Sequence, residues 1–258
     1  MVITDRFKSR PGAETVRLPS GGEMTLAVEH AAAILVNEQT AFRVVCTPEL
    51  LPQLALGRLL TEGWITCADE VEQIAVCAEG LKVSVHLTHP LEAAAAGQEV
   101  PSCCTDNLTV ASPVKLRPLA PVPQREIPDE WVETLAAAMG DELPLYRATH
   151  AVHSCFVLRD GKILYQCEDL GRHNALDKAV GCALAEGVQL GQCVLYTSGR
   201  VPVDMVRKAI RAGVPALVSK TMPTVQSLEL AEAYGLKLLI RKKKSFHAAA
   251  TKVRECSD

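Results

Sequence analysis

The second half of the chain repeats one hydrophobic pattern three times: an apolar run, a polar loop marked by Gly or Pro, and an amphipathic segment. The apolar runs are KILYQC (162–167), QCVLYT (192–197) and PALVSK (215–220), and a fourth, LKLLIR (236–241), closes the series. Strands that alternate with helical segments predict right-handed crossovers and a mainly parallel sheet. Residues 129–161 add a helix and one more strand in a hairpin. We therefore predict an α/β layer sandwich.

The first half follows a different pattern, which predicts an α+β organisation. Residues 25–48 alternate as two strands with a turn at Asn37–Thr40, and residues 71–87 resemble a second hairpin with Glu79–Gly80 at its turn. Between them, apolar residues at helical spacing predict a helix with Thr47 as N-cap and Pro48 at its first position.

A proline-rich stretch separates the two patterns. Five prolines fall between Pro113 and Pro128, a density that suits neither a helix interior nor a central strand. The predicted organisation is a smaller α+β domain over residues 1–112, an extended connector over 113–129 and an α/β domain over 130–258.

Composition narrows the range of partners. The 258 residues carry a net charge of −3, which favours neither nucleic acid nor a membrane surface as a partner. The first residues lack the apolar region of a signal peptide, and no run reaches the roughly 20 apolar residues of a membrane span. We expect a cytoplasmic protein whose ten cysteines are reduced and lack zinc-site spacing.

The loops that follow the parallel strands are the first candidates for chemistry, because ligands bind at the carboxyl ends of such strands. These loops, EDLGRHN, TSGR and SKTMPT, place cations, hydroxyls and amides near helix N-termini, which bind anions. The candidate residues are Arg172, His173, Asn174, Thr197, Ser198, Gly199, Arg200, Ser219, Lys220 and Thr221. A ligand that bears phosphate is the functional interpretation. The alternative is that Asn174, Ser198 and Thr221 only cap their helices.

The sequence leaves the roles of two histidine-containing segments open. His173 suits either a general acid or base or a structural position held by a backbone carbonyl. The carboxylates beside it are expected to cap the helix or to hold Arg172. The segment THAVHSC (149–155) has two histidines, but it lacks the Glu of a zinc deaminase, and no P-C-x-x-C follows.

Cys103 and Cys104 stand side by side in PSCCTDN, a polar stretch just before the connector. A disulfide between adjacent cysteines closes a strained ring, so a stable structural bond is the least favoured role. Redox chemistry as a dithiol and carriage of sulfur as a persulfide both fit the pair, as does an exposed pair with no role.

The segments EDLGRHNALDKAVG, YTSGRVPVDMVRKAIRAGVPALVSKTMPT and LALGRLLTEGWI resemble the formate dehydrogenase accessory sulfurtransferase family (FdhD-like). The resemblance extends from about Leu26 to Arg241. It implies that the second half has the cytidine deaminase fold without its zinc chemistry. It also implies a sulfurtransferase that accepts persulfide sulfur from a cysteine desulfurase and passes it to the molybdenum bis(guanine dinucleotide) cofactor of formate dehydrogenase.

The resemblance assigns roles to residues. Gly171–Asn174, Thr197–Arg200 and Ser219–Thr224 become the loops that face the cofactor, with GDP as a mimic of its nucleotide part. Cys103 becomes the persulfide carrier and Cys104 its helper. The resemblance also implies pairing as a homodimer.

Two positions depart from the family pattern. Asp106 stands where the family pattern has its second cysteine, and His150 and Ala151 replace the glycines of TGG-x-H. A second hypothesis therefore remains, a chaperone that holds the cofactor but does not move sulfur. A third is a dithiol oxidoreductase that is indifferent to guanine nucleotides.

Overall fold

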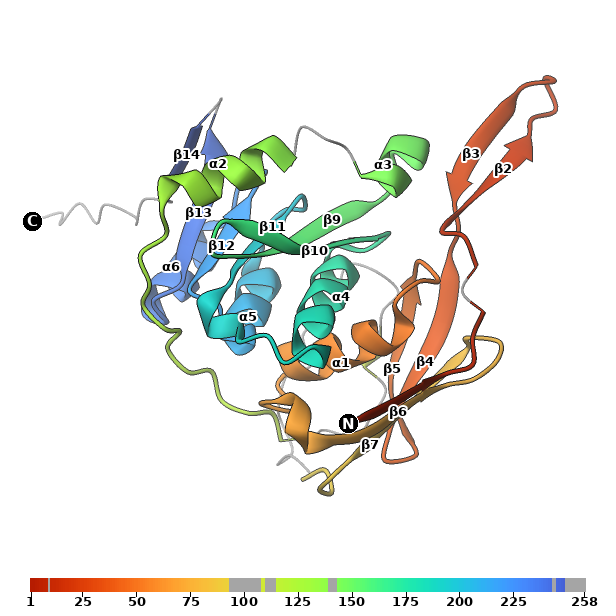
Figure 1. Ribbon diagram of the computed structural model, residues 1–258, viewed down its shortest axis with the longest axis horizontal. Helices are drawn as coiled ribbons and strands as arrows, with labels where there is room; N and C mark the ends of the chain where they lie inside the picture. Colours follow the sequence, from red (N-terminus) through yellow and green to blue (C-terminus); the bar gives the residue numbers. More distant parts are fainter. Residues whose placement is uncertain (9, 93–107, 110–114, 139–142, 243–244, 249–258) are drawn as a thin grey trace, which may run out of the picture.

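Two mixed six-stranded sheets, one two-stranded sheet and helices that pack between and around the larger sheets make up the described part of the protein (Figure 1). The computed structural model describes residues 1–8, 10–92, 108–109, 115–138, 143–242 and 245–248. The mixed α/β fold class predicted from the hydrophobic pattern is confirmed.

The second sheet contains the repeated pattern, and its strand order is β10-β9-β11-β12-β13-β14. Strand β11 pairs in parallel with β12 and β12 with β13, whereas β9 runs antiparallel between β10 and β11. The strands β10 to β13 therefore point the same way, as the pattern predicts. The bounds are β9 His153–Arg159, β10 Lys162–Asp169, β11 Val194–Thr197, β12 Ala216–Ser219, β13 Lys237–Lys242 and β14 Ser245–Ala248.

Helices cover both faces of this sheet because its strands are apolar on both sides. Phe156 and Leu158 of β9 pack with Leu135 on one face, where helix α2 lies. Cys155 and Val157 belong to the larger core on the other face, against α4, α5 and α6 (Figure 1). Burial of one such large side chain contributes roughly 1.5–3 kcal/mol. The helices are α2 Asp129–Ala138, α3 Pro144–Thr149, α4 Arg172–Ala185, α5 Val203–Ala212 and α6 Val225–Ala233, with a 3₁₀ turn at Leu190–Gln192.

The first sheet has the order β1-β6-β7-β4-β5-β8 and contains both predicted hairpins. The β4–β5 turn has positive φ at Asn37 and Glu38, and the β6–β7 turn has it at Gly80. A separate hairpin, β2–β3, projects away from the body of the protein (Figure 1). The bounds are β1 Val2–Asp5, β2 Ala13–Arg17, β3 Glu23–Ala27, β4 His30–Val36, β5 Gln39–Cys46, β6 Val71–Val76, β7 Lys82–Leu87 and β8 Leu108–Thr109, with a 3₁₀ turn at Ala68–Glu70.

Helix α1 (Leu51–Thr61) lies between the two sheets and packs tightly on α4. A Cβ atom on Gly57 would lie 1.8 Å from the carbonyl oxygen of Asp177, and one on Gly181 would lie 1.9 Å from that of Gln53. Glycine is therefore required on both sides of this crossing. One hydrophobic core runs through it and includes residues from both sheets.

The predicted start of this helix was wrong. Its N-cap is Leu50, in the left-handed region with φ of 58°, and not Thr47. The backbone N–H of Thr47 donates to Asp169 Oδ2 at 3.0 Å, so this threonine binds a carboxylate 122 residues away instead of capping its own helix.

Residues 115–128 contain no helix or strand, and Val122 N donates to the carbonyl of Tyr234 at 2.9 Å. This connector thus lies against the second half. The division into domains at 113–129 stays a prediction, since the two halves share a core. Among the described residues, no helix is long and apolar enough to cross a membrane.

Candidate functional site

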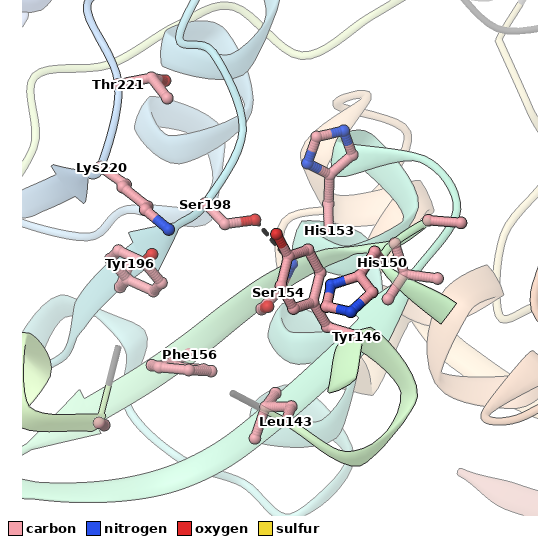
Figure 2. Close-up of a pocket in the computed structure, with 13 residues that line it drawn as sticks. Leu143, Tyr146, His150, His153, Ser154, Phe156, Tyr196, Ser198, Lys220 and Thr221 are labelled. Atoms are coloured by element: carbon pink, nitrogen blue, oxygen red, sulfur yellow. Dashed lines mark hydrogen bonds between the residues drawn. The ribbon is translucent and has the colours of Figure 1, made fainter. Parts of the chain in front are cut away.

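A cavity of about 460 Å³ opens beside the carboxyl ends of β11 and β12, at the edge where the sequence predicts a ligand. Figure 2 shows Lys220 and Ser198 on one side of the cavity and Tyr146 with His150 on the other. Phe156 and Tyr196, 4.9 Å apart between ring centroids, lie at its floor. The lining residues are Ala138, Leu143, Tyr146, His150, Ala151, Val152, His153, Ser154, Phe156, Tyr196, Ser198, Lys220 and Thr221.

Three of the predicted residues line this cavity: Ser198, Lys220 and Thr221. Their loops are held by backbone pairing across the sheet end. Ser198 exchanges two hydrogen bonds with Ser154, donating its N–H at 3.0 Å and accepting at Oγ at 2.9 Å. Thr221 Oγ1 donates to the carbonyl of Gly199 at 2.7 Å. The last of these bonds joins the loop at residues 197–200 to the loop at residues 219–221, and we call the joined loops the rim of the cavity.

Arginines flank the rim. Arg172 is only 8% exposed and lies across Gly199. A Cβ atom added to Gly199 would lie 2.7 Å from the Cβ of Arg172. Arg200 is exposed beside it. Glycine at 199 therefore allows the Arg172 side chain to lie over the loop. Both arginines lie close enough to His153 to affect its titration. Burial lowers the pKa of His153, and the charges of Arg172 and Arg200 lower it further. The rim is thus positive, as an anion requires.

Four other predicted residues point into the protein. His173 is fully buried, and its Nε2 lies 2.7 Å from Asp204 Oδ2 on α5. Burial opposes the charge on Asp204, but the hydrogen bond and charge of His173 outweigh it and lower the pKa of this carboxyl. Asn174 donates to the carbonyl of Val45 at 2.8 Å. Thr197 and Ser219 are buried and hydrogen-bond within the rim. These four residues brace the loops from behind.

The alternative that Asn174, Ser198 and Thr221 only cap their helices is contradicted, because none of them is the N-cap of a helix. Helices α4 and α5 begin at Gly171 and Pro202, and neither has a side-chain cap. Thr224 caps α6 by accepting from the N–H of Ser227 at 3.2 Å. Ser198 and Thr221 therefore owe their positions to the rim, and not to a helix end.

Asp169 organises the start of α4 from below. Its Oδ1 accepts from Gly171 N at 3.0 Å and from Asn174 Nδ2 at 2.9 Å, and its Oδ2 lies 2.7 Å from Lys178 Nζ. Glu168 accepts from Leu145 N and Tyr146 N and thereby caps α3. Of the two roles expected for these carboxylates, binding at a helix start is the one observed, and no described contact pairs either of them with Arg172.

Tyr146, His150 and His153 line the cavity, although none of them was among the site residues predicted from the sequence. The signal was present, since β9 was predicted to form a hairpin with β10. The amino end of β9 must then lie at the carboxyl end of β10, which puts THAVH at the ligand edge. His150, at the end of α3, has φ of 53° in the left-handed region that favours glycine. Its ring contacts Tyr146 edge-on at 5.3 Å.

Cys103 and Cys104, the predicted sulfur carriers, lie outside the described residues. In the part of the chain that the structure describes, no cluster of three or more His, Cys, Asp or Glu could hold a metal ion. The cavity is therefore defined by aromatic rings, hydroxyls and cations.

The FdhD/NarQ family model matches residues 27–249. The chain belongs to this family. Sulfur carrier protein FdhD of Nocardia farcinica is 32% identical over 243 residues, which cover 87% of this chain and 86% of that protein. The FdhD of Listeria monocytogenes serotype 4b is 28% identical over 220 residues, covering 83% and 84%.

A crystal structure of a formate dehydrogenase accessory protein from Desulfotalea psychrophila superposes with a TM-score of 0.70 at 27% identity. It covers 93% of this chain and 96% of that one. The resemblance seen in the sequence is thus confirmed at the level of the FdhD/NarQ family.

Proposed function

We propose that this FdhD/NarQ family member carries sulfur as a persulfide on Cys103, with Cys104 as a helper thiol. It receives the sulfur from a cysteine desulfurase and passes it to the molybdenum bis(guanine dinucleotide) cofactor of formate dehydrogenase, the cofactor being its substrate. Family membership carries the proposal, because the relatives are named sulfur carriers. The protein would act in the cytoplasm, and pairing as a homodimer belongs to the same proposal.

The cavity supports the nucleotide part of this substrate. Its volume of about 460 Å³ lies within the range of small-molecule sites, roughly 300–1,000 Å³. Tyr146, which is partly exposed, offers a ring surface to a base, and the hydroxyls of Ser198 and Thr221 offer polar contacts. Lys220, which lines the cavity, and the charges of Arg172 and Arg200 near His153 suit phosphates. The size of the cavity, its aromatic ring and its cations thus support the proposal of a nucleotide as ligand.

The second candidate function is a chaperone that binds the cofactor without moving sulfur. The observation that favours it is Asp106, which stands where the family pattern has a second cysteine. Persulfide transfer needs an attacking thiolate, and a carboxylate cannot supply it.

One experiment separates the two. The full chain is incubated with a cysteine desulfurase and cysteine, alongside Cys103→Ala and Cys104→Ala, and mass spectrometry locates any added sulfur atom. An adduct on wild type that Cys103→Ala abolishes supports the carrier. No adduct on any form, with GDP binding retained, would instead establish the chaperone.

A parallel titration tests the cavity with GDP as the probe. Lys220→Ala should weaken GDP binding roughly tenfold, because a charge-assisted contact is lost. Lys82→Ala is the matched control, since Lys82 is an exposed lysine on β7 in the other sheet. Equal affinities for both variants would remove Lys220 from the site.

A further inference from the structure

Strand β10 and helix α4 are joined by three matched side-chain pairs. Tyr165 Oη donates to Glu186 Oε2 at 2.7 Å, the Sγ atoms of Cys167 and Cys182 lie 4.0 Å apart, and Lys178 Nζ lies 2.7 Å from Asp169 Oδ2. The strand members are two residues apart and the helix members four. We call each of these three pairs a rung between the strand and the helix. The cysteine pair is the middle rung.

The register of the rungs follows from element geometry. Two residues of a strand advance roughly 6.6 Å and four residues of a helix roughly 6 Å. Strand and helix run in opposite directions, joined by Leu170 and Gly171, so each step along one matches a step along the other. The outer rungs hold the two sulfur atoms opposite each other, and a side-chain rotation can close the remaining gap without a shift of register.

The two thiols differ in the way that an attacking and a resolving cysteine differ. Cys182 is half-buried, whereas Cys167 is 3% exposed. The hydrogen bond with Cys167, together with the charge of Lys178, lowers the pKa of the Cys182 thiol. The same bond and burial raise the pKa of Cys167. Cys182 is thus the more accessible of the two thiols and ionises more readily than Cys167.

We propose that Cys167 and Cys182 form a redox-active dithiol that closes to a disulfide when a hydroperoxide oxidises Cys182. This site is separate from Cys103 and Cys104 and does not depend on the proposed sulfur transfer.

The chemistry balances in two steps. The Cys182 thiolate attacks the peroxide O–O bond, forms an S–O bond and releases hydroxide, which takes up a proton to become water. Cys167 then loses its proton and attacks the Cys182 sulfur, and the S–O bond breaks to release a second water. Two thiols give up two electrons to one hydrogen peroxide, and a thiol reductant reverses the bond.

Cys193 offers a matched control. It lies in the same region, but it is buried and its Sγ donates to the carbonyl of Gln189 at 3.5 Å. Burial also raises the pKa of its thiol to about 11. Cys193 should therefore stay reduced under conditions that oxidise Cys182.

The test uses the full chain carrying Cys103→Ser and Cys104→Ser, so that its outcome is independent of sulfur carriage. The reduced protein is treated with hydrogen peroxide, remaining thiols are alkylated, and a tryptic digest is read by mass spectrometry. We expect a reductant-sensitive cross-link between peptides 163–172 and 179–200, with fragmentation placing it at Cys182. Adding Cys182→Ser should abolish the cross-link, and adding Cys193→Ser should leave it unchanged.

Circular dichroism of each variant confirms that the comparison is between folded proteins. A cross-link to Cys193, or recovery of Cys167 as an alkylated thiol after Cys182 has become a sulfinic acid, would overturn the proposal. So would full alkylation of both thiols after exposure to peroxide.

Discussion

The buried pair of Asp169 and Lys178 lies in the second half of the chain and binds Thr47 of the first half, so we expect its loss to weaken the fold strongly. Both side chains are fully buried, 2.7 Å apart. Lys178 Nζ also donates to Thr47, at 3.2 Å to its carbonyl and at 2.6 Å to Oγ1. Replacement by methionine keeps the apolar stem of the side chain and removes all three contacts. The carboxylate of Asp169 then has no cation beside it.

Breaking a buried pair from one side costs about 3–5 kcal/mol, because the remaining charge has lost its counter-ion. Asp169 would keep four hydrogen bonds, from Thr47 N and Oγ1, Gly171 N and Asn174 Nδ2. These bonds offset part of the loss, so we expect Lys178→Met to lose about 3 kcal/mol. The double variant with Asp169→Asn should lose less than the sum of the two single losses, by about 1 kcal/mol or more.

The assay is urea unfolding at neutral pH, followed by circular dichroism, for the wild type, both single variants and the double variant. Lys82→Met, at an exposed position on β7, serves as the control and should change the free energy of unfolding by less than about 0.5 kcal/mol. If the free energy of unfolding of Lys178→Met lies within about 1 kcal/mol of the wild-type value, the pair with its contacts to Thr47 does not stabilise the fold by the expected amount. Strict additivity of the two substitutions would also refute the reasoning.

Three further predictions follow from the core and the rim. Burial raises the pKa of Glu62, but nearby cations, led by Lys208, have the larger effect and lower this pKa from 4.5 to about 2. The carboxylate therefore stabilises the fold above about pH 4.5, and this contribution is lost as the pH falls through about 2. The stability advantage of the wild type over Glu62→Gln should therefore shrink as pH falls toward 2, in acid titrations of unfolding; a constant difference would contradict this. Gly57→Ala forces α1 away from α4 and should lose at least about 1–3 kcal/mol of unfolding free energy in urea, whereas Gly22→Ala, whose Cβ would meet only Leu18 Cδ1 at 4.0 Å, should lose little. His150→Gly removes a side chain from a residue in the left-handed region, so the free energy of unfolding, measured by thermal unfolding, should rise by about 0.5–1 kcal/mol. A fall in this free energy would show that the contact of the His150 ring with Tyr146 contributes more.

Much of the architecture could be predicted from local patterns. The apolar runs of the second half predicted the strands β10 to β13, and their order with helices predicted one common edge for the loops. Turn residues such as Asn37 and Gly80 marked the hairpins, because few residues accept positive φ. Ser198, Lys220 and Thr221 were found on the cavity for the same reason: their place follows from strand direction alone.

The sequence by itself therefore determined the alternation of strands and helices in the second half and the edge at which the cavity forms, since these depend on periodicity and on nearby residues. Tertiary structure alone decided which side chains face that site. His173 and Asn174 turn inward because Asp204 and Val45 lie there, and Thr47 leaves its own helix for Asp169, 122 residues away. Such partners meet only when the two halves pack, and no local pattern encodes a hydrogen bond between residues so distant along the chain.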